Sequence, residues 1–277
     1  MIYPPKTIHL QNHIIVNMKK LLLISLLTLV SLTAFSQSKG SPKFLGIPID
    51  GTEARFAAQL KSKGFTYNSL YDCYKGQFNG QNVEVYLHTN HNLMDRVYVA
   101  FPYTTEESIR VEYNRLLDQF KYNGKYANFS MNERIPEDDD ISYEITINNK
   151  RYQASFSYFD PDRDPAAFVD AFLDKFNDFF TPEQIAVLKE FSKENPDADA
   201  DVMLGQLMAR LQSLDINPNI DIEQDPEKAL QFLSTIMERL KSLADGSVWF
   251  MIHEHLGRYQ IGLYYDNLHN QAHGEDL

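Results

Sequence analysis

Cysteine is almost missing from this sequence, because Cys73 is the only one among 277 residues. A lone thiol cannot form a disulfide within its own chain, so side-chain packing must hold the fold together. The neighbouring residues, Leu70 to Tyr74, are typical of an apolar strand. We therefore expect the Cys73 thiol to be buried and unreactive.

Basic residues are also scarce. The chain contains 26 Lys and Arg against 38 Asp and Glu, which gives a formal net charge of −12. Nucleic acid binding requires clustered positive charge at the phosphates, so this composition argues against a nucleic acid partner. The hydrophobic fraction of 43%, with 16 Tyr and 18 Phe, is typical of a folded protein with an aromatic core and not of a disordered chain.

Motifs that carry well-known chemistry are missing as well. The sequence contains no nucleophile elbow, phosphate loop, dinucleotide fingerprint, HExxH helix or paired-cysteine metal motif. The segment Asp160 to Asp164 resembles the start of a calcium loop, but Pro165 and Ala171 stand where that loop needs Gly and Glu. No cofactor is expected, and the absence of motifs favours a protein that is not an enzyme.

A long hydrophobic run occurs once, from Leu21 to Leu32. Lys19 and Lys20 precede this run, and the small residues Ala34 and Ser36 follow it, which is the order found in a secretory signal peptide. The run is shorter than the ~20 residues that span a membrane. We expect residues 18–36 to be a signal peptide that is cut after Ser36.

This assignment has consequences for the compartment. Met18 begins the basic stretch, so residues 1–17 are expected to be a wrongly assigned N-terminal extension. No cysteine near the cut could carry a lipid, and no second run is long enough for a membrane anchor. The mature chain, residues 37–277, is expected in the periplasm or outside the cell.

Hydrophobic periodicity in the mature chain predicts an α+β fold. Helical patterns alternate with short strands that are joined by tight turns such as Asn79-Gly80, and strands linked in this way pair antiparallel. The expected fold is a single domain, in which an antiparallel sheet built from hairpins has helices packed on one face. A helical insertion at about 181–246 precedes the last hairpin. The expected helices begin near Asp50, Thr104, Asp164, Thr181, Val202 and Asp225, and the expected strands cover residues 74–78, 83–87, 93–101, 141–147, 151–158, 248–252 and 259–264.

Many tyrosines lie on or beside the expected strands. A sheet with helices on one face leaves its other face open, and tyrosines there are good contacts for sugar rings or protein partners. We expect Tyr86, Tyr98, Tyr152 and Tyr259 to form such a ligand-binding surface. The alternative is that about half of the strand tyrosines line the core. The favoured function is a secreted, non-catalytic binding module for a glycan or an envelope protein.

A pair of histidines suggests a second function. His253 and His255 alternate on one expected strand, so their side chains point to the same face of the sheet. Two imidazoles can hold Zn²⁺ if a third ligand joins them, and His88 or His91 could supply it if their strand lies nearby. A metal-binding protein is therefore one alternative, and an exposed pair without a metal is the simpler interpretation.

A carboxylate-dependent hydrolase acting on envelope or dietary polymers is the other alternative. Sugar hydrolysis needs two Asp or Glu side chains at a suitable separation. The 38 acidic residues offer many such pairs. The acidic run Glu137 to Asp140 could also bind a cation or a basic partner, although runs of this kind in loops are usually solvated.

Two segments resemble known proteins. The opening Phe44 to Thr52 with Leu60 to Phe65, and the closing Val248 to Phe250 with Tyr264 to Asn267, are similar to a group of uncharacterised secreted proteins from gut anaerobes. The resemblance covers most of the mature chain and implies no particular activity. More remotely, the expected layout resembles the β-lactamase-inhibitor-like and PepSY-like envelope modules, which implies a fold and not a function.

Overall fold

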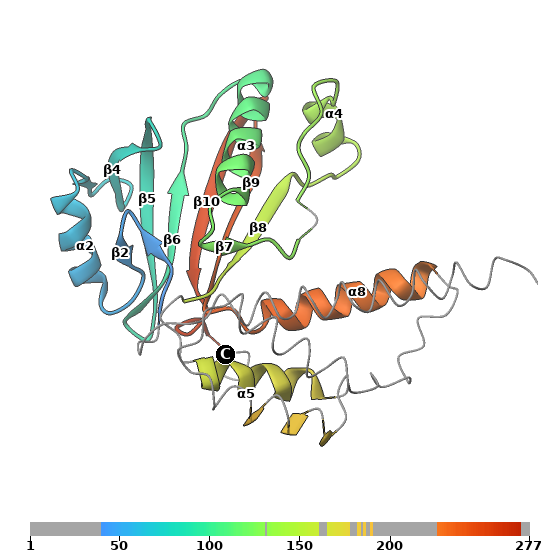
Figure 1. Ribbon diagram of the computed structural model, residues 1–277. Helices are drawn as coiled ribbons and strands as arrows, with labels where there is room; N and C mark the ends of the chain where they lie inside the picture. The colour runs from blue at the N-terminus through green and yellow to red at the C-terminus, as the bar shows by residue number, and fades with distance from the viewer. Residues whose placement is uncertain are drawn as a thin grey trace, which may run out of the picture. The chain divides into compact units, whose positions relative to one another are not determined.

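The computed structural model describes residues 40–130, 132–160, 165–177, 182–183, 185–186, 189–190 and 226–272 (Figure 1). The expected signal peptide and the helix expected at Val202 lie outside these residues. The chain forms two compact units. Of the described residues, those within 40–160 and 240–272 form the first, which we call the sheet unit, and those within 165–239 form the second, which we call the helical unit.

The sheet unit contains one antiparallel sheet of eight strands, in the order β3-β4-β5-β6-β10-β9-β8-β7, and a separate two-stranded hairpin, β1-β2. The expected α+β fold with an antiparallel sheet is therefore confirmed. The strands are β1 (Lys43–Phe44), β2 (Ile47–Pro48), β3 (Thr66–Asn68), β4 (Cys73–Phe78), β5 (Gln81–Asn90), β6 (Leu93–Ala100), β7 (Tyr126–Ala127), β8 (Gln153–Tyr158), β9 (Gly246–His255) and β10 (Arg258–Asn267).

Three tight turns build most of this sheet. The residue pairs Asn79-Gly80, His91-Asn92 and Leu256-Gly257 all have positive φ angles, between 48° and 79°. Two consecutive residues with positive φ match the right-handed twist of the strands that they connect. These turns therefore set the pairing of β4 with β5, of β5 with β6 and of β9 with β10.

The last hairpin joins the centre of the sheet. Strand β10 pairs with β6 on one side and with β9 on the other, and β9 then pairs with β8. The C-terminal strands thus link the early meander β3–β6 to β8 and β7 (Figure 1). Cys73 on β4 is fully buried and free, as the strand pattern around it predicts.

Two helices cover one face of the sheet. Helix α2 (Glu53–Ser62) contacts β5 and β6, and helix α3 (Glu106–Lys121) lies over β10 and contacts β7 (Figure 1). The side chains of Thr52 and Thr105 cap them by accepting hydrogen bonds from Arg55 N and Ser108 N. The helix starts expected at Asp50 and Thr104 are therefore two residues and one residue too early. Thr104 instead pairs its backbone with Tyr259, which holds it in an extended conformation.

The hairpin expected from 141–147 and 151–158 is also wrong in its first half. Residues Ile141–Thr146 form a short helix, α4, although their β-branched and aromatic side chains favour a strand. Tertiary and capping contacts override that preference. The Asp140 side chain accepts a hydrogen bond from Tyr143 N, and the Ile141 N–H donates to the Glu106 carboxylate of α3. Strand β8 pairs with β9 and β7 instead.

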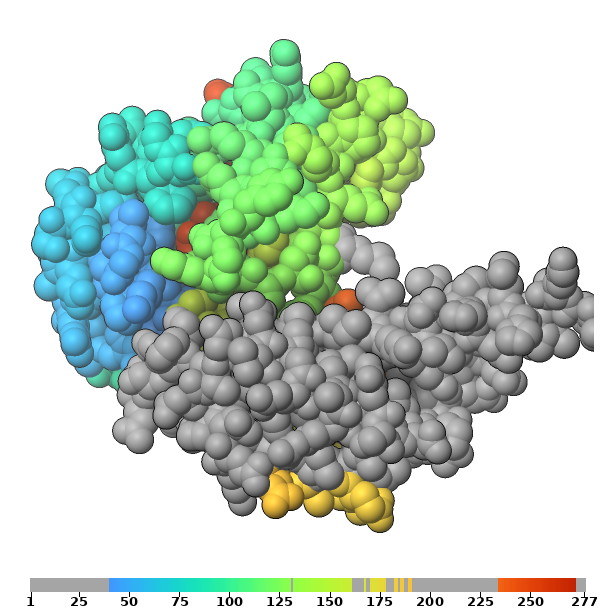
Figure 2. Space-filling view, viewed as in Figure 1, coloured from blue at the N-terminus to red at the C-terminus, as the bar shows by residue number. Residues whose placement is uncertain are grey.

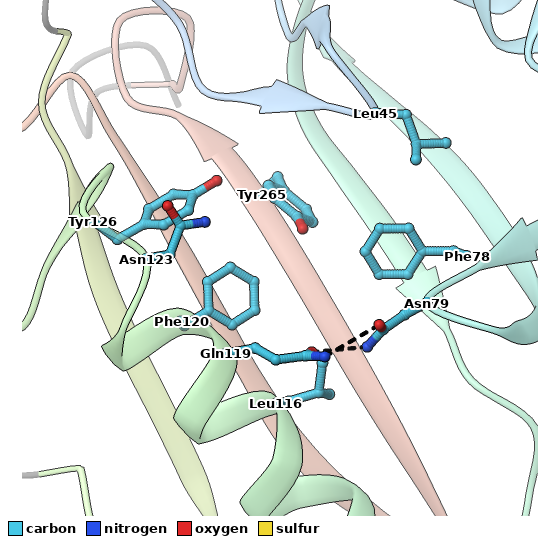
Figure 3. Close-up of a pocket in the computed structure, with 9 residues that line it drawn as sticks. All are labelled: Leu45, Phe78, Asn79, Leu116, Gln119, Phe120, Asn123, Tyr126 and Tyr265. Carbon is cyan, nitrogen blue, oxygen red and sulfur yellow. Dashed lines mark hydrogen bonds between the residues drawn. The ribbon is translucent and has the colours of Figure 1, made fainter.

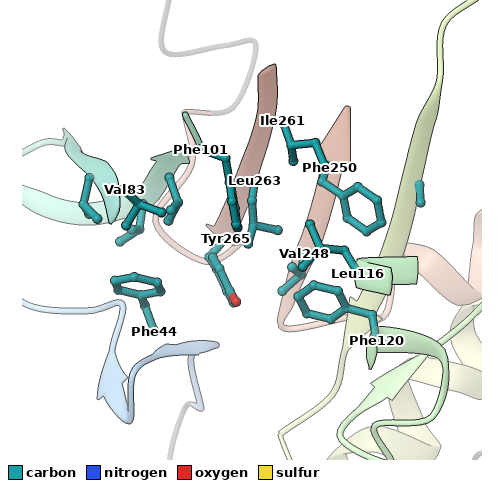
Figure 4. Packing of buried hydrophobic residues seen from close by; sticks show 14 of the residues in the cluster. Phe44, Val83, Phe101, Leu116, Phe120, Val248, Phe250, Ile261, Leu263 and Tyr265 are labelled. Carbon is teal, nitrogen blue, oxygen red and sulfur yellow. The ribbon is translucent and has the colours of Figure 1, made fainter. Parts of the chain in front are cut away.

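The core fills the space between the sheet and its covering helices (Figure 4). Tyr113 and Phe120 of α3 pack on Phe250 of β9, with ring centroids 5.1 and 6.0 Å apart. The β1–β2 hairpin contributes Phe44, whose ring lies 5.5 Å from that of Tyr265 on β10. Large aromatic side chains thus attach both α3 and the small hairpin to the same central strands.

The helical unit contains helix α5 (Pro165–Lys175) and most of helix α8 (Pro226–Lys241). Both begin with proline, as expected, because the first helical position needs no N–H donor. Phe172 and Phe176 stack with centroids 4.6 Å apart, and the Arg239 guanidinium lies 5.8 Å from the centre of the Phe176 ring. Over the part of the chain that the structure describes, no helix is both long enough and apolar enough to cross a membrane.

Candidate functional site

Four aromatic rings stack across four neighbouring strands. The strand register places Tyr86 of β5 opposite Tyr98 of β6, and Tyr264 of β10 between Tyr98 and Trp249 of β9. Ring centroids along this series are 5.4, 4.6 and 3.8 Å apart, with interplanar angles of 24°, 17° and 6°. The four side chains form one continuous stack, which we call the aromatic row.

The aromatic row lies on the face of the sheet opposite to α2 and α3. Side chains alternate between the two faces along each strand. The residues next to the row in sequence, including Val85, Val99 and Leu263, belong to the core beneath the helices. The row residues are partly exposed. We call this second surface of the sheet the aromatic face.

A buried carboxylate holds one side of the aromatic row. Asp266 is only 4% exposed and accepts two hydrogen bonds from the Arg96 guanidinium, at 2.6 and 3.2 Å. Its second oxygen also accepts a hydrogen bond of 2.8 Å from the Trp249 indole N–H. The guanidinium lies 5.8 Å from the ring centres of both Trp249 and Tyr264, so an ion pair and two cation–π contacts fix these rings.

A glycine makes room on the other side of the row. A Cβ atom at Gly262 would lie 2.8 Å from His253 Nε2 and 2.9 Å from Tyr98 Cε2, which is closer than real Cβ atoms approach other atoms. The His253 ring and the Tyr98 ring therefore occupy the space where another residue would have a side chain. His253 Nε2 also forms a hydrogen bond of 3.2 Å with the Tyr264 hydroxyl.

An open hollow of about 650 Å³ adjoins the row. Glu84 connects the two features, because it lines the hollow and accepts a hydrogen bond of 3.0 Å from the Tyr86 hydroxyl. Glu84 and Ala100 each lie two residues from a ring of the row, on the same face. The hollow is lined by Lys75, Gly76, Asn82, Val83, Glu84, Ala100, Phe101, Pro102, Tyr103 and Gln260.

The charges at the hollow neutralise each other. Lys75 Nζ lies 2.8 Å from the Glu84 carboxylate, and this hydrogen bond lowers the pKa of Glu84 below its usual value. Two neutral amides, Asn82 and Gln260, and the half-exposed phenol of Tyr103 complete the polar lining. The surface can therefore donate and accept hydrogen bonds without carrying a net charge.

The titratable rings at the aromatic face stay neutral near pH 7. Burial raises the pKa of Tyr98 well above its usual value, and the nearby Tyr264 adds to this effect. Burial and the hydrogen bond to Glu84 raise the pKa of Tyr86 in the same way. Burial lowers the pKa of His253, which disfavours the charged imidazolium.

The tyrosines expected to bind a ligand fall into two groups. Tyr86 and Tyr98 belong to the aromatic row. Tyr152 and Tyr259 face the helices and are only 5% and 2% exposed, so they do not belong to this surface. On that side, the Tyr152 hydroxyl donates a hydrogen bond to Asp139, and the backbone of Tyr259 pairs with that of Thr104.

Sequence reasoning missed the second half of the row, Tyr264 and Trp249. Both were visible as strand residues, but their meeting depends on register. The two-residue turn Leu256-Gly257 places Trp249 directly opposite Tyr264, and this could have been worked out from the turn. The pairing of Tyr264 with Tyr98 could not, because it depends on β10 lying beside β6.

The histidines expected to bind metal are not brought together with a third ligand. His253 contacts Tyr264, His255 lies exposed at the end of β9, and His88 Nδ1 lies 2.6 Å from the Asp95 carboxylate. Among the described residues, no three His, Cys, Asp or Glu side chains are grouped so as to hold a metal ion. The geometry gives no support to the metal-binding alternative.

The acidic run Glu137 to Asp140 has a structural role in part. Asp140 caps α4. Asp139 accepts hydrogen bonds from the Tyr152 hydroxyl at 2.7 Å and from Lys150 Nζ at 2.9 Å, and these contacts lower its pKa. These two carboxylates therefore fix the loop before β8.

Comparisons with protein-family models, with curated proteins and with solved structures each found no match to this chain. The resemblance to secreted proteins of gut anaerobes stays a prediction, and the function must be argued from the site alone.

Proposed function

We propose that the protein is an exported, non-catalytic binding module that holds a neutral oligosaccharide on its aromatic face. The observation that carries this proposal is that the hollow adjoins the aromatic row. Glu84, which lines the hollow, accepts a hydrogen bond from Tyr86 of the row. A pocket lined by apolar and aromatic groups, with a few fixed polar groups, is the usual form of a small-ligand site.

The polar groups of the hollow favour a ligand with many hydroxyl groups. Glu84 accepts hydrogen bonds, Lys75 donates them, and the amides of Asn82 and Gln260 do both. The ion pair between Lys75 and Glu84 is already balanced, so a charged ligand would find no opposite charge to pair with. The net charge of −12 further disfavours anionic polymers.

The rim supplies surfaces on which a sugar ring can pack. Tyr103 lines the hollow and is 44% exposed, and Tyr71 is 57% exposed with the Lys75 ammonium 5.2 Å from its ring centre. Such rings offer a large apolar contact area with a polar tip. The lining of the hollow extends over β4, β5, β6 and β10, which suits a ligand of several linked sugar units.

The same lining argues against the hydrolase alternative. Glu84 is the one carboxylate among the residues that line the hollow, and Lys75 keeps it ionised. Hydrolysis of a glycosidic bond needs two carboxyl groups, one of which has a raised pKa and donates a proton. The hollow therefore has the groups for binding and lacks the acid for cleavage.

Calorimetric titration of the purified protein with neutral and uronic-acid oligosaccharides tests the proposal. At least one neutral oligosaccharide should bind, and Tyr103→Ala should weaken that binding about tenfold, the usual size for loss of one well-placed contact residue. Tyr122→Ala is the matched control, because Tyr122 is 81% exposed and follows α3 on the other side of the sheet. Binding of a polyuronate alone, release of reducing ends, or equal effects of the two substitutions would contradict the proposal.

A further inference from the structure

A second hollow lies on the opposite face of the sheet, between the β1–β2 hairpin and α3. It has a volume of about 270 Å³ (Figure 3). In Figure 2, red atoms of the C-terminal strands are visible between the blue hairpin segment and the green segment that contains α3, so this hollow opens to the surface of the sheet unit. It is lined by Leu45, Phe78, Asn79, Leu116, Gln119, Phe120, Asn123, Tyr126 and Tyr265.

The hydroxyl of Tyr265 points into this hollow, towards the space between Phe78 and Phe120 (Figure 3). Tyr265 is 5% exposed, and burial raises its pKa well above the usual value. Among the residues that the structure describes, none forms a hydrogen bond with this hydroxyl. The oxygen itself is not enclosed by the protein, because it faces the hollow, so a ligand that enters the hollow can reach it.

Tyr152 offers a comparison within the same core. It is also 5% exposed, but its hydroxyl donates a hydrogen bond of 2.7 Å to Asp139. Both rings belong to the same hydrophobic core. The fold therefore provides a partner for one buried phenol and directs the other into an accessible space.

The walls of the hollow define the chemistry that it accepts. Phe78, Phe120 and Leu116 present apolar surface, and no residue of the lining carries a charge. At the rim, the side-chain amides of Asn79 and Gln119 bind each other through hydrogen bonds of 2.9 and 3.3 Å. The space combines the Tyr265 hydroxyl at its base, and a second phenol at Tyr126, with aromatic walls and a neutral amide rim.

We propose that this hollow is a binding site for a small neutral molecule with one flat or compact hydrophobic ring and a single hydrogen-bonding group. The ring would pack between Phe78 and Phe120, and the polar group would bind the Tyr265 hydroxyl. A volume near 270 Å³ lies at the lower end of the range for small-molecule pockets, which excludes large ligands. This site lies across the sheet from the aromatic face and does not depend on the oligosaccharide proposal.

Titration of the purified protein with 4-methylphenol, benzyl alcohol and cyclohexanol, followed by saturation-transfer NMR and calorimetry, tests this site. At least one of these probes should bind with a dissociation constant of roughly 0.1–1 mM, as expected for such small ligands. Benzoate, which has the same size but carries a charge, should bind at least tenfold more weakly, because no lining residue can pair with it.

Two variants locate the binding. Tyr265→Phe removes only the hydroxyl and should weaken probe binding about tenfold, the effect of losing one hydrogen bond. Leu45→Trp should abolish binding by filling the hollow from its rim. Tyr152→Phe, which removes an equally buried hydroxyl elsewhere, should leave probe binding unchanged.

The stability of the probe-free variants gives an independent readout. Tyr265→Phe should keep or raise the unfolding temperature, because its hydroxyl has no partner in the protein, whereas Tyr152→Phe should lower it. The proposal is overturned if no probe binds at 10 mM, which would mean that ordered water alone satisfies the hydroxyl. It is also overturned if Tyr265→Phe binds the probes as well as the unchanged protein, or destabilises the probe-free protein as much as Tyr152→Phe.

Discussion

The strongest structural prediction concerns Asp266, which organises the aromatic face. Its carboxylate is 4% exposed and accepts hydrogen bonds from Arg96 and from the Trp249 indole. Replacing it with alanine leaves both donors without their acceptor and removes the negative charge that balances Arg96. The substitution should therefore weaken the fold and loosen the aromatic row at the same time.

The size of the loss can be estimated from these contacts. Removing one partner of a fully buried ion pair costs about 3–5 kcal/mol. The Arg96 side chain is 37% exposed, so water can solvate part of its charge once Asp266 is gone. The indole N–H is part-buried, and leaving it unpaired costs up to about 1–3 kcal/mol. We expect Asp266→Ala to lower the free energy of unfolding by about 2–4 kcal/mol in total.

Urea denaturation measures this directly. Trp249 is the only tryptophan of the chain, so its fluorescence reports on the aromatic row, and far-UV circular dichroism reports on the whole fold. Asp118→Ala is the matched control, because Asp118 forms an ion pair with Arg134 in which both side chains are at least 40% exposed. Such surface pairs contribute about 0–1 kcal/mol.

Asp266→Asn separates charge from hydrogen bonding. The amide oxygen can still accept from Trp249, so this variant should lose less stability than Asp266→Ala. If Asp266→Ala cost no more than Asp118→Ala, the carboxylate would not support the row, and the argument from buried hydrogen bonds would fail.

Three further predictions follow from the same contacts. Gly262→Val should destabilise the protein by about 1–3 kcal/mol, because the valine side chain would displace Tyr98 and His253. Thermal unfolding measures this loss, and an unchanged melting temperature would contradict the prediction. Burial lowers the pKa of His253 in the folded protein. As the pH falls below about 6.5, the imidazole is therefore protonated in the unfolded chain before it is protonated in the folded protein, and the free energy of unfolding should decrease. His253→Gln should remove this part of the pH dependence, and equal slopes for both proteins between pH 7 and 5 would argue against it. The Asn132 side-chain amide accepts a hydrogen bond from Ser155 N and donates one to Ser155 O at the edge of β8. Asn132→Ala should therefore expose this strand edge and increase aggregation, which light scattering measures. Unchanged scattering would contradict this prediction.

Local patterns in the sequence determined much of the secondary structure. The turns Asn79-Gly80 and Leu256-Gly257, and the prolines at 165 and 226, act on neighbouring residues alone, so they can be recognised without knowing the fold. The alternation of polar and apolar residues likewise predicted which strands have one buried face. The antiparallel α+β fold followed from these local signals.

Local patterns failed where a distant contact outweighs them. Residues 141–146 read as a strand, yet the Glu106 carboxylate of α3 holds their first N–H, and they form a helix. Tyr152 and Tyr86 look alike in the sequence, because each lies on or beside a strand. Tyr152 packs beneath the helices, whereas Tyr86 lies in the aromatic row. Neither local sequence indicates which side of the sheet the helices cover.

Tertiary structure decided how each candidate site is assembled. The aromatic row needs β10 to lie between β6 and β9, which brings Tyr98 and Tyr264 together from positions 166 residues apart. The hollow around Tyr265 needs a hairpin, a helix and a central strand to leave a space that no single segment encodes. Short-range signals specify elements, and the packing of those elements against one another determines which side chains meet.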